Sequence, residues 1–303
     1  MSNEKDSGIN ILSLGGGVQS STLALMVEHG EAFGEDGEKI APPVAAVFAD
    51  TGDESDATYA WLNWLECQLS YPVIRADRGE SLSEHIFNAI DNGTRASTPP
   101  LFTEPISVSK EVIPETSTEP SLFDDMAFAK PTKVMASGKA GILTRVCTMD
   151  FKIVVIRRAI RKLMAGYGVK KCVQWIGISL DESVRMKPSR VQYSKHRWPL
   201  IEMRMSRHDC FRWMEAHGYP EPPRSACVYC PHHDNNEWRR IRDEEPESWD
   251  AAVKFDAKIR NGTTGTRQRC YVHRQCVPLP EVDLSEDDSG LLWGNECEGM
   301  CGV

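Results

Sequence analysis

The chain has 303 residues, of which 41% are hydrophobic and 26% charged, and a formal net charge of −9. This predicts a globular protein with one large domain, or with one domain and an appended subdomain. No run of 18 apolar residues is present and the N-terminus lacks an apolar signal core, so we expect no membrane span and a cytoplasmic location. Thiols stay reduced there, so the ten cysteines indicate metal or redox chemistry rather than a disulfide framework.

The charge is distributed unevenly along the chain. Residues 141–200 hold 13 Lys and Arg against 3 Asp and Glu, a local balance of +10 that leaves −19 for the remainder. A basic segment in an acidic protein suggests an anionic partner, either a nucleotide or a nucleic acid such as RNA or DNA. The alternative is a solvated helix face.

Apolar runs alternate with helical patterns in the first third of the chain. Strands are expected at 9–14, 44–49 and 72–75, and helices at 20–28, 54–69 and 81–90. Trp61 and Trp64 lie on one face of the second helix and are expected in the core. This alternation predicts an α/β fold with a parallel sheet and right-handed crossovers.

The regular pattern stops at residues 94–140, where six prolines fall between Pro99 and Pro131. This stretch is interpreted as an insertion or a lid over the site. A helix follows at 150–165, a strand at 172–178, and a helix from Ser206 to about His217. We therefore divide the chain into an α/β domain at 1–205 and a helical, cysteine-rich, metal-binding region at 206–303.

A glycine-rich loop joins the first strand to the first helix, with the sequence SLGGGVQSST at residues 13–22. Glycine allows the backbone to approach a ligand closely, and the free N–H groups at a helix start bind anions such as phosphate. The pattern is neither a Walker loop nor a GxGxxG fingerprint. The alternative is a glycine-rich turn that binds no ligand.

The loop resembles the PP-loop of the adenine nucleotide α-hydrolase superfamily, whose pattern is Ser-Gly-Gly-x-Asp-Ser. Gly16, Gly17 and Ser20 match this pattern, whereas Gly15 stands in place of the Ser and Gln19 in place of the Asp. The resemblance implies a doubly wound, Rossmann-like sheet of the PP-loop (HUP) type that binds ATP and Mg²⁺.

Two further segments resemble the phosphoadenosine phosphosulfate (PAPS) reductase-like family of that superfamily. FADTGDE at 48–54 is similar to its Asp-Thr-Gly segment, and GISLDESVR at 177–185 is similar to a segment whose Arg, here Arg185, pairs with phosphate or sulfate. The alternatives are a helix-capping turn and an exposed arginine. Together the resemblances imply that the nucleotide contacts Ser13, Gly15, Gly16, Gly17, Gln19, Ser20, Ser21, Asp50 and Thr51.

A Cys-x-x-Cys-Pro turn at 227–231 has a spacing that suits zinc, an iron–sulfur cluster or a redox pair. TRVCTMDFK at 144–152 resembles the segment of adenylyl-sulfate reductases and thiolation enzymes that supplies a cluster ligand, here Cys147, and a substrate-contacting lysine, here Lys152. Near the C-terminus, Cys297 resembles the nucleophilic cysteine of sulfonucleotide reductases. The expected ligands of a [4Fe–4S] cluster, or of zinc as the alternative, are Cys147, Cys227, Cys230, Cys297 and Cys301.

The other cysteines and the two histidines after the turn receive no firm role. Cys270 and Cys276 could form a second site with the C-terminal cysteines. Cys67, Cys172 and Cys210 are expected to be small buried hydrophobic residues. His232 and His233 are alternative ligands, but are expected to be polar surface residues.

The resemblance implies an enzyme that adenylates an acceptor, releases pyrophosphate and then transfers sulfur from a donor protein with the aid of the cluster. Its catalytic residues would be Ser20, Lys152, Arg185 and Cys297. One alternative is reductive cleavage of a sulfonucleotide, supplied with electrons by a donor protein. Another is a nucleotide-binding regulatory protein with a structural zinc site and no catalysis.

Overall fold

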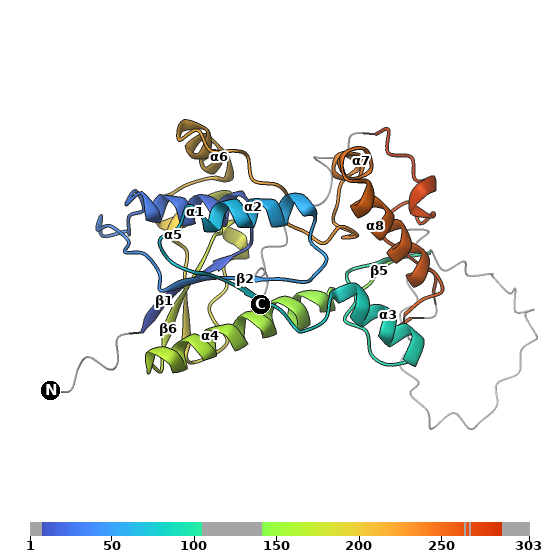
Figure 1. The fold of residues 1–303 in the computed structure, drawn as a ribbon, viewed down its shortest axis with the longest axis horizontal. Helices are drawn as coiled ribbons and strands as arrows, with labels where there is room; N and C mark the ends of the chain where they lie inside the picture. Colours follow the sequence, from blue (N-terminus) through green and yellow to red (C-terminus); the bar gives the residue numbers. More distant parts are fainter. Residues whose placement is uncertain (1–7, 105–140, 264, 267, 287–303) are drawn as a thin grey trace, which may run out of the picture.

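The computed structural model describes residues 8–104, 141–263, 265–266 and 268–286, and its centre is a five-stranded parallel sheet (Figure 1). The sheet order is β3-β2-β1-β6-β7. Its strands are β1 (Ile9–Leu14), β2 (Ala45–Ala49), β3 (Val73–Ala76), β6 (Cys172–Ile176) and β7 (Ser194–Arg197). The predicted α/β fold with a parallel sheet is confirmed.

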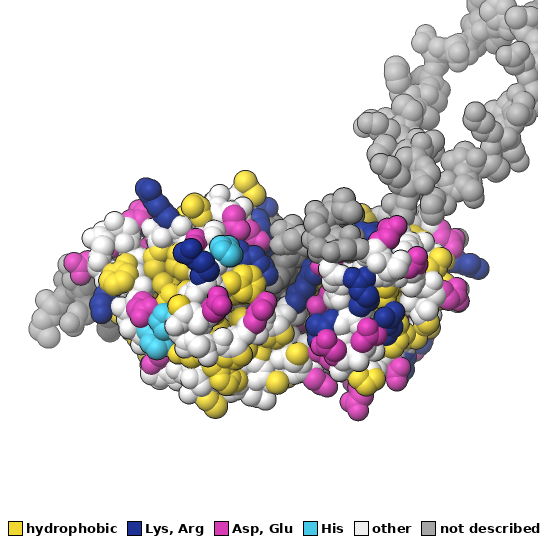
Figure 2. Space-filling model, turned by 90° about the horizontal axis from the view of Figure 1, so that it is seen from above, with side chains coloured by type: hydrophobic (Ala, Val, Ile, Leu, Met, Phe, Trp, Pro, Cys, Tyr) yellow, Lys and Arg dark blue, Asp and Glu magenta, His cyan; other side chains and the backbone are white. Residues whose placement is uncertain are grey.

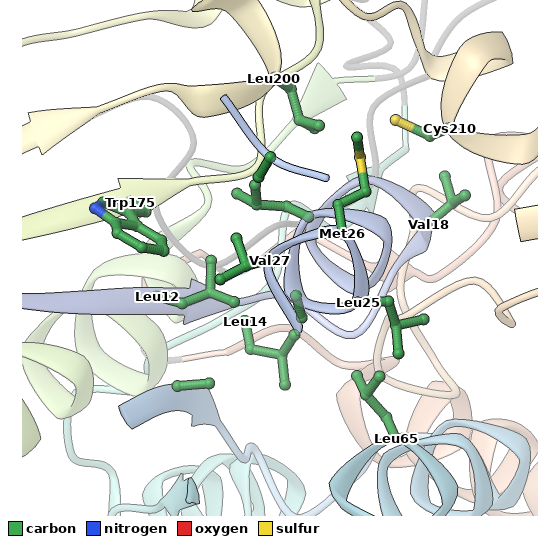
Figure 3. Close-up of a cluster of buried hydrophobic side chains, with 14 of the residues drawn as sticks. Leu12, Leu14, Val18, Leu25, Met26, Val27, Leu65, Trp175, Leu200 and Cys210 are labelled. Carbon is green, nitrogen blue, oxygen red and sulfur yellow. The ribbon is translucent and has the colours of Figure 1, made fainter. Parts of the chain in front are cut away.

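Helices cover both faces of this sheet (Figure 1). Helices α1 (Val18–Glu28) and α2 (Asp56–Glu66) lie on one face, and α4 (Val154–Tyr167) lies on the other. Helix α1 is buried from Val18 to Val27 because α5 (Pro199–Glu202) and α6 (Arg207–Ala216) pack against it. Figure 3 shows the resulting core around α1, in which Trp175 of β6 and Leu65 of α2 also lie.

The strand order determines where a ligand can be placed. Strand β1 pairs with β2 on one side and with β6 on the other, and all of these pairings are parallel. The winding of the chain therefore reverses between β1 and β6. In open α/β sheets, ligands bind in the crevice at the carboxyl ends of the strands at such a switch point. The segments that follow β1, β2 and β6 all meet at this edge.

The remaining elements form a second packed region, on the right in Figure 1. It contains the antiparallel sheet β5 (Gly141–Ile142), β4 (Phe102–Thr103) and β8 (Cys270–Tyr271), and the helices α3 (Leu82–Asn92), α7 (Asn235–Glu244) and α8 (Pro246–Ile259). Tyr229 stacks on Phe255 within its core, with ring centroids 3.6 Å apart. Figure 2 shows basic and acidic side chains intermixed on the surface of this region.

Some local features differ from the sequence-based expectations. A π-helical turn, Thr148–Ile153, precedes α4, where an ordinary helix was expected to begin at 150. Cys172 and Cys210 are buried as predicted, but the prediction for Cys67 is wrong, because this residue ends α2 on an exposed side. Residues 105–140 of the expected insertion lie outside the described residues. No helix among the residues the structure describes is long and apolar enough to cross a membrane.

We predict that Gly177→Ala lowers the free energy of unfolding by about 1–3 kcal/mol, the usual effect of overpacking a core. A Cβ at this position would lie 2.8 Å from the Cα of Ser20, so the end of β6 and the start of α1 would have to separate. Urea denaturation measures the change.

Gly166→Ala is the matched control. Gly166 lies in α4, and a Cβ there meets nothing within 4 Å. We expect this variant to be about 0.5–1 kcal/mol more stable than the wild type, because alanine is the better helix former. Equal stability of the two variants would contradict the close approach at Gly177.

Candidate functional site

The glycine loop between β1 and α1 exposes a run of hydrogen-bond donors. Gly16 has a φ of +81°, and Gly17 caps α1 without a side-chain hydrogen bond. Among the described residues, the backbone N–H groups of residues 16–20 have no acceptor. The hydroxyl of Ser20 accepts a hydrogen bond of 3.0 Å from the Gly15 N–H. A helix start with unsatisfied N–H groups can bind an anion.

Gln19 connects this loop to the segment after β6. Its side-chain amide is fully buried and donates to the Ser179 hydroxyl at 2.7 Å and to the Glu182 carboxylate at 2.8 Å. Glu182 in turn forms a 2.6 Å ion pair with Arg185. The segments 13–22 and 177–185, both selected from the sequence, therefore lie together, and a carboxylate and a guanidinium stand beside the loop.

The segment after β2 divides into residues with different surroundings. Asp50 accepts hydrogen bonds of 2.8 Å from both the Gly52 N–H and the Tyr59 hydroxyl, so one of its oxygens holds the local turn. Thr51 is buried, with its hydroxyl 3.1 Å from the Glu54 carboxylate and 3.2 Å from the Cys227 sulfur. Thr51 thus joins the β2 edge to the cysteine turn. Of the other predicted contacts, Ser21 accepts a hydrogen bond from Trp61, and Ser13 accepts one from Gln174.

Three of the predicted metal ligands line one cavity. Cys147, Cys227 and Cys230 share its walls with Lys152 and Thr51. Burial, and the nearby Glu54 carboxylate, raise the pKa of the Cys227 thiol well above its usual value. Within the described part of the chain, no group of three or more His, Cys, Asp or Glu side chains is arranged to hold a single metal ion. Cys297 and Cys301 lie outside the described residues.

Cys270 and Cys276 lie at a different place, beside the small sheet. Cys270 is in β8, and the Cys276 sulfur lies 3.6 Å from the carbonyl oxygen of Thr103, next to β4. Burial raises the pKa of Cys270 to about 11 and also raises that of Cys276. Neither residue lines the cavity that holds the other three cysteines.

Of the two histidines after the turn, His232 is half-buried and His233 is buried. His232 lines the cavity, and His233 is buried, with Nε2 2.9 Å from the Cys227 carbonyl oxygen. Burial lowers the pKa of each to about 4, so both are neutral near pH 7. The surface prediction is therefore wrong for His233, because the chain folds back on the turn and encloses it.

A buried ion pair that the sequence did not reveal lies beside the cysteines. The Lys152 ammonium is 3.7 Å from the Glu54 carboxylate, and both side chains are less than a tenth exposed. The other oxygen of Glu54 has no partner among the described residues. Desolvation raises the pKa of Glu54, although Lys152 and Thr51 oppose the shift. The sequence did not predict this role for Glu54, because acidic residues after a strand commonly cap a helix.

Asp53 fixes the cysteine turn to the sheet edge. Its carboxylate accepts a 2.6 Å hydrogen bond from the Tyr229 hydroxyl and 2.7 Å bonds from the backbone and hydroxyl of Ser83. Its carbonyl oxygen accepts from the Val228 N–H at 2.9 Å. Burial raises the pKa of this carboxyl, and the three hydrogen bonds oppose that shift. These contacts hold the Cys-x-x-Cys turn next to β2.

Comparison with known proteins adds no assignment. No model of a protein family matches the chain, and no curated protein matches it. The sheet order is consistent with a Rossmann-like fold. The chemistry of the site must therefore be inferred from its own residues.

We predict that Lys152→Met lowers the free energy of unfolding by about 3–5 kcal/mol near pH 8, because it leaves the Glu54 carboxylate buried without its cation. A raised pKa favours the protonated carboxyl. The loss should therefore be smallest below the ordinary pKa of Glu and should grow as the pH rises through the raised folded-state value. Urea midpoints between pH 4.5 and 8 measure this.

The double variant Lys152→Met/Glu54→Gln is the control for this pair. It removes both charges, so we expect it to regain more than half of the lost stability at pH 8. If the loss of stability in the double variant equals the sum of the losses in Lys152→Met and Glu54→Gln, the two side chains do not interact.

Proposed function

We propose that the chain binds ATP on the glycine loop, adenylates an acceptor with release of pyrophosphate, and transfers sulfur to the adenylated carbon with release of AMP, aided by a [4Fe–4S] cluster at the cysteine cavity. The proposal rests on one juxtaposition. Free N–H donors at the start of α1 and a cavity lined by three cysteines meet at the carboxyl edge of the same sheet. This arrangement can place an activated phosphate ester next to a sulfur-binding centre.

The loop supplies the chemistry that adenylation needs. An acceptor oxygen attacks the α-phosphorus, the bond from this phosphorus to the bridging oxygen breaks, and pyrophosphate leaves with the electron pair. The N–H groups of residues 16–20 can stabilise the charge on the phosphates. Ser20 supports the loop by accepting the Gly15 N–H at 3.0 Å.

The structure offers a reason why Gln19 stands in place of the PP-loop Asp. An Asp at this position would stand close to Glu182 and would be repelled by it, whereas the Gln19 amide donates to Glu182 at 2.8 Å. The site thus retains one carboxylate at the loop. We propose that Glu182 takes the place of the missing Asp in binding Mg²⁺, which prefers carboxylate oxygens and phosphate.

We propose that the cysteines lining the cavity bind an iron–sulfur cluster. Zinc is the alternative, and Cys297 and Cys301, the two further candidate ligands, lie outside the described residues. A cluster takes one thiolate on each of several irons, which suits cysteines spread over a cavity wall. Cys147, Cys227 and Cys230 would hold it, with a further ligand from Cys297 or Cys301. When bound, it would supply iron that carries sulfur or electrons.

Lys152 and Arg185 can bind an anionic substrate. Lys152 lines the cavity, next to the three cysteines. Arg185 lies beside the loop, where it is positioned by Glu182. We propose that Lys152 contacts the acceptor and that Arg185 contacts the nucleotide phosphates. Arg158, Arg161 and Lys162 are exposed on α4, which supports an acceptor that is part of RNA or DNA.

We predict that Ser20→Ala lowers the rate of pyrophosphate release from ATP about tenfold, because the Gly15 N–H loses its partner and the loop loses a hydroxyl. Released pyrophosphate is measured by an enzyme-coupled assay. Ser248→Ala, a buried serine in α8 away from the loop, should retain the wild-type rate. Wild-type turnover in Ser20→Ala would remove this residue from the site.

We predict that Cys227→Ala, purified without oxygen, loses its iron and acid-labile sulfide, whereas the wild type carries about four of each per chain. Cys210→Ala is the matched control, because Cys210 is a buried thiol in α6 that does not line the cavity. Full metal content in Cys227→Ala would show that Cys227 is not a ligand.

The same preparations separate the proposal from its rivals. Sulfite release from a sulfonucleotide without ATP would indicate a reductase, whose proposed nucleophile is Cys297. Zinc in place of iron, together with ATP binding and no pyrophosphate release, would indicate a nucleotide-binding protein with a structural metal.

A further inference from the structure

Ser225 lies between the glycine loop and the cysteine turn. It precedes Cys227 by two residues, is only 2% exposed, and has a hydroxyl with no hydrogen-bond partner among the described residues. A Cβ placed on Gly16 would lie 3.2 Å from this hydroxyl oxygen. The cysteine turn therefore contributes a buried hydroxyl to the wall of the loop, although the two segments are about two hundred residues apart in sequence.

The glycine loop beside this hydroxyl carries a run of unpaired hydrogen-bond donors. The backbone N–H groups of residues 16–20 have no acceptor in the described part of the chain, and the Ser225 hydroxyl lies against the same loop. Buried polar groups without partners are destabilising, and they are rare unless a ligand satisfies them. An anion with several acceptor oxygens can satisfy such a run of donors. Phosphate is such an anion.

The neighbours of Ser225 hold it in place. Arg224 forms a 3.0 Å ion pair with Asp234 and donates to the carbonyl oxygen of His232 at 2.8 Å. On the other side, Cys227 forms an isolated β-bridge with Glu54. The backbone on both sides of the serine is thus held by these contacts.

We propose that Ser225 donates a hydrogen bond to a phosphate oxygen bound on the glycine loop and thereby links nucleotide binding to the Cys-x-x-Cys turn. The inference rests on the proposed function only in taking the loop as a phosphate site. It adds a contact from the cysteine-rich region that the PP-loop pattern does not contain.

The test compares Ser225→Ala with the wild type and with Ser248→Ala, using ATP, inorganic pyrophosphate and adenosine as probes. Ser225→Ala should bind ATP and pyrophosphate about tenfold more weakly, because a hydrogen bond to a charged oxygen is lost. Its affinity for adenosine should not change. Isothermal titration calorimetry measures all three, and Ser248→Ala should match the wild type.

Thermal melting distinguishes a ligand contact from a purely structural role. If Ser225 only stabilised the fold, its removal would lower the melting temperature of the ligand-free protein. Ligand-free Ser225→Ala should melt at or above the wild-type temperature, because an unsatisfied buried hydroxyl is removed. Its stabilisation by saturating pyrophosphate should be smaller than that of the wild type. A lower melting temperature without ligand, with unchanged pyrophosphate affinity, would overturn the inference.

The two proposals fail in different ways. If the wild type binds ATP and pyrophosphate but releases no pyrophosphate from ATP, the proposed adenylation fails and the Ser225 contact is still tested by the affinities. If Ser225→Ala binds pyrophosphate like the wild type, the contact is refuted and the proposed function is unaffected. A wild type that binds neither ATP nor pyrophosphate refutes both.

Discussion

The candidate site depends on the unsatisfied first turn of a helix that is buried along its length. Helix α1 packs between the sheet and the α5 and α6 helices, so its axis and its starting point are fixed by the core. Its N-terminus is therefore held at the switch point of the sheet, between β1 and β6. Because no side chain caps it, the N–H groups and the positive end of the helix dipole remain available to an anion.

The surrounding charges follow from this position. Gln19, on the first turn, carries a neutral amide that donates to Glu182, and Arg185 then balances the carboxylate. Near the cysteines, Glu54 and Lys152 are buried together, an arrangement that is costly to desolvate and that natural proteins often retain at functional sites. Gln19, Glu54 and Ser225 each have one buried polar atom without a partner among the described residues, and all three lie at this sheet edge.

The cysteine turn packs against the same edge of the sheet. Asp53 accepts from Tyr229 and Val228, Thr51 contacts Cys227, and Ser225 lies against Gly16. These contacts tie the turn to the ends of β1 and β2. A short chain of contacts therefore connects the glycine loop to the thiols. The second pair, Cys270 and Cys276, lies beside the small sheet, away from the cavity that the other three cysteines line.

The sequence by itself determined the alternation of strands and helices, and with it the parallel sheet. It also determined that 13–22, 48–54 and 177–185 follow strands at one edge, because apolar periodicity and glycine placement are local properties. It placed Cys172 and Cys210 in the interior but misplaced Cys67 and His233, whose burial depends on what packs over them.

Only the tertiary structure decided the rest. The Glu54–Lys152 pair, the Gln19–Glu182 contact and the position of Ser225 join residues that are far apart along the chain. The π-helical turn at Thr148–Ile153 likewise cannot be recognised from the 3.6-residue periodicity of apolar residues. Such features depend on long-range packing and desolvation. The type of a residue does not show which distant residues will pack against it or how much water it will lose.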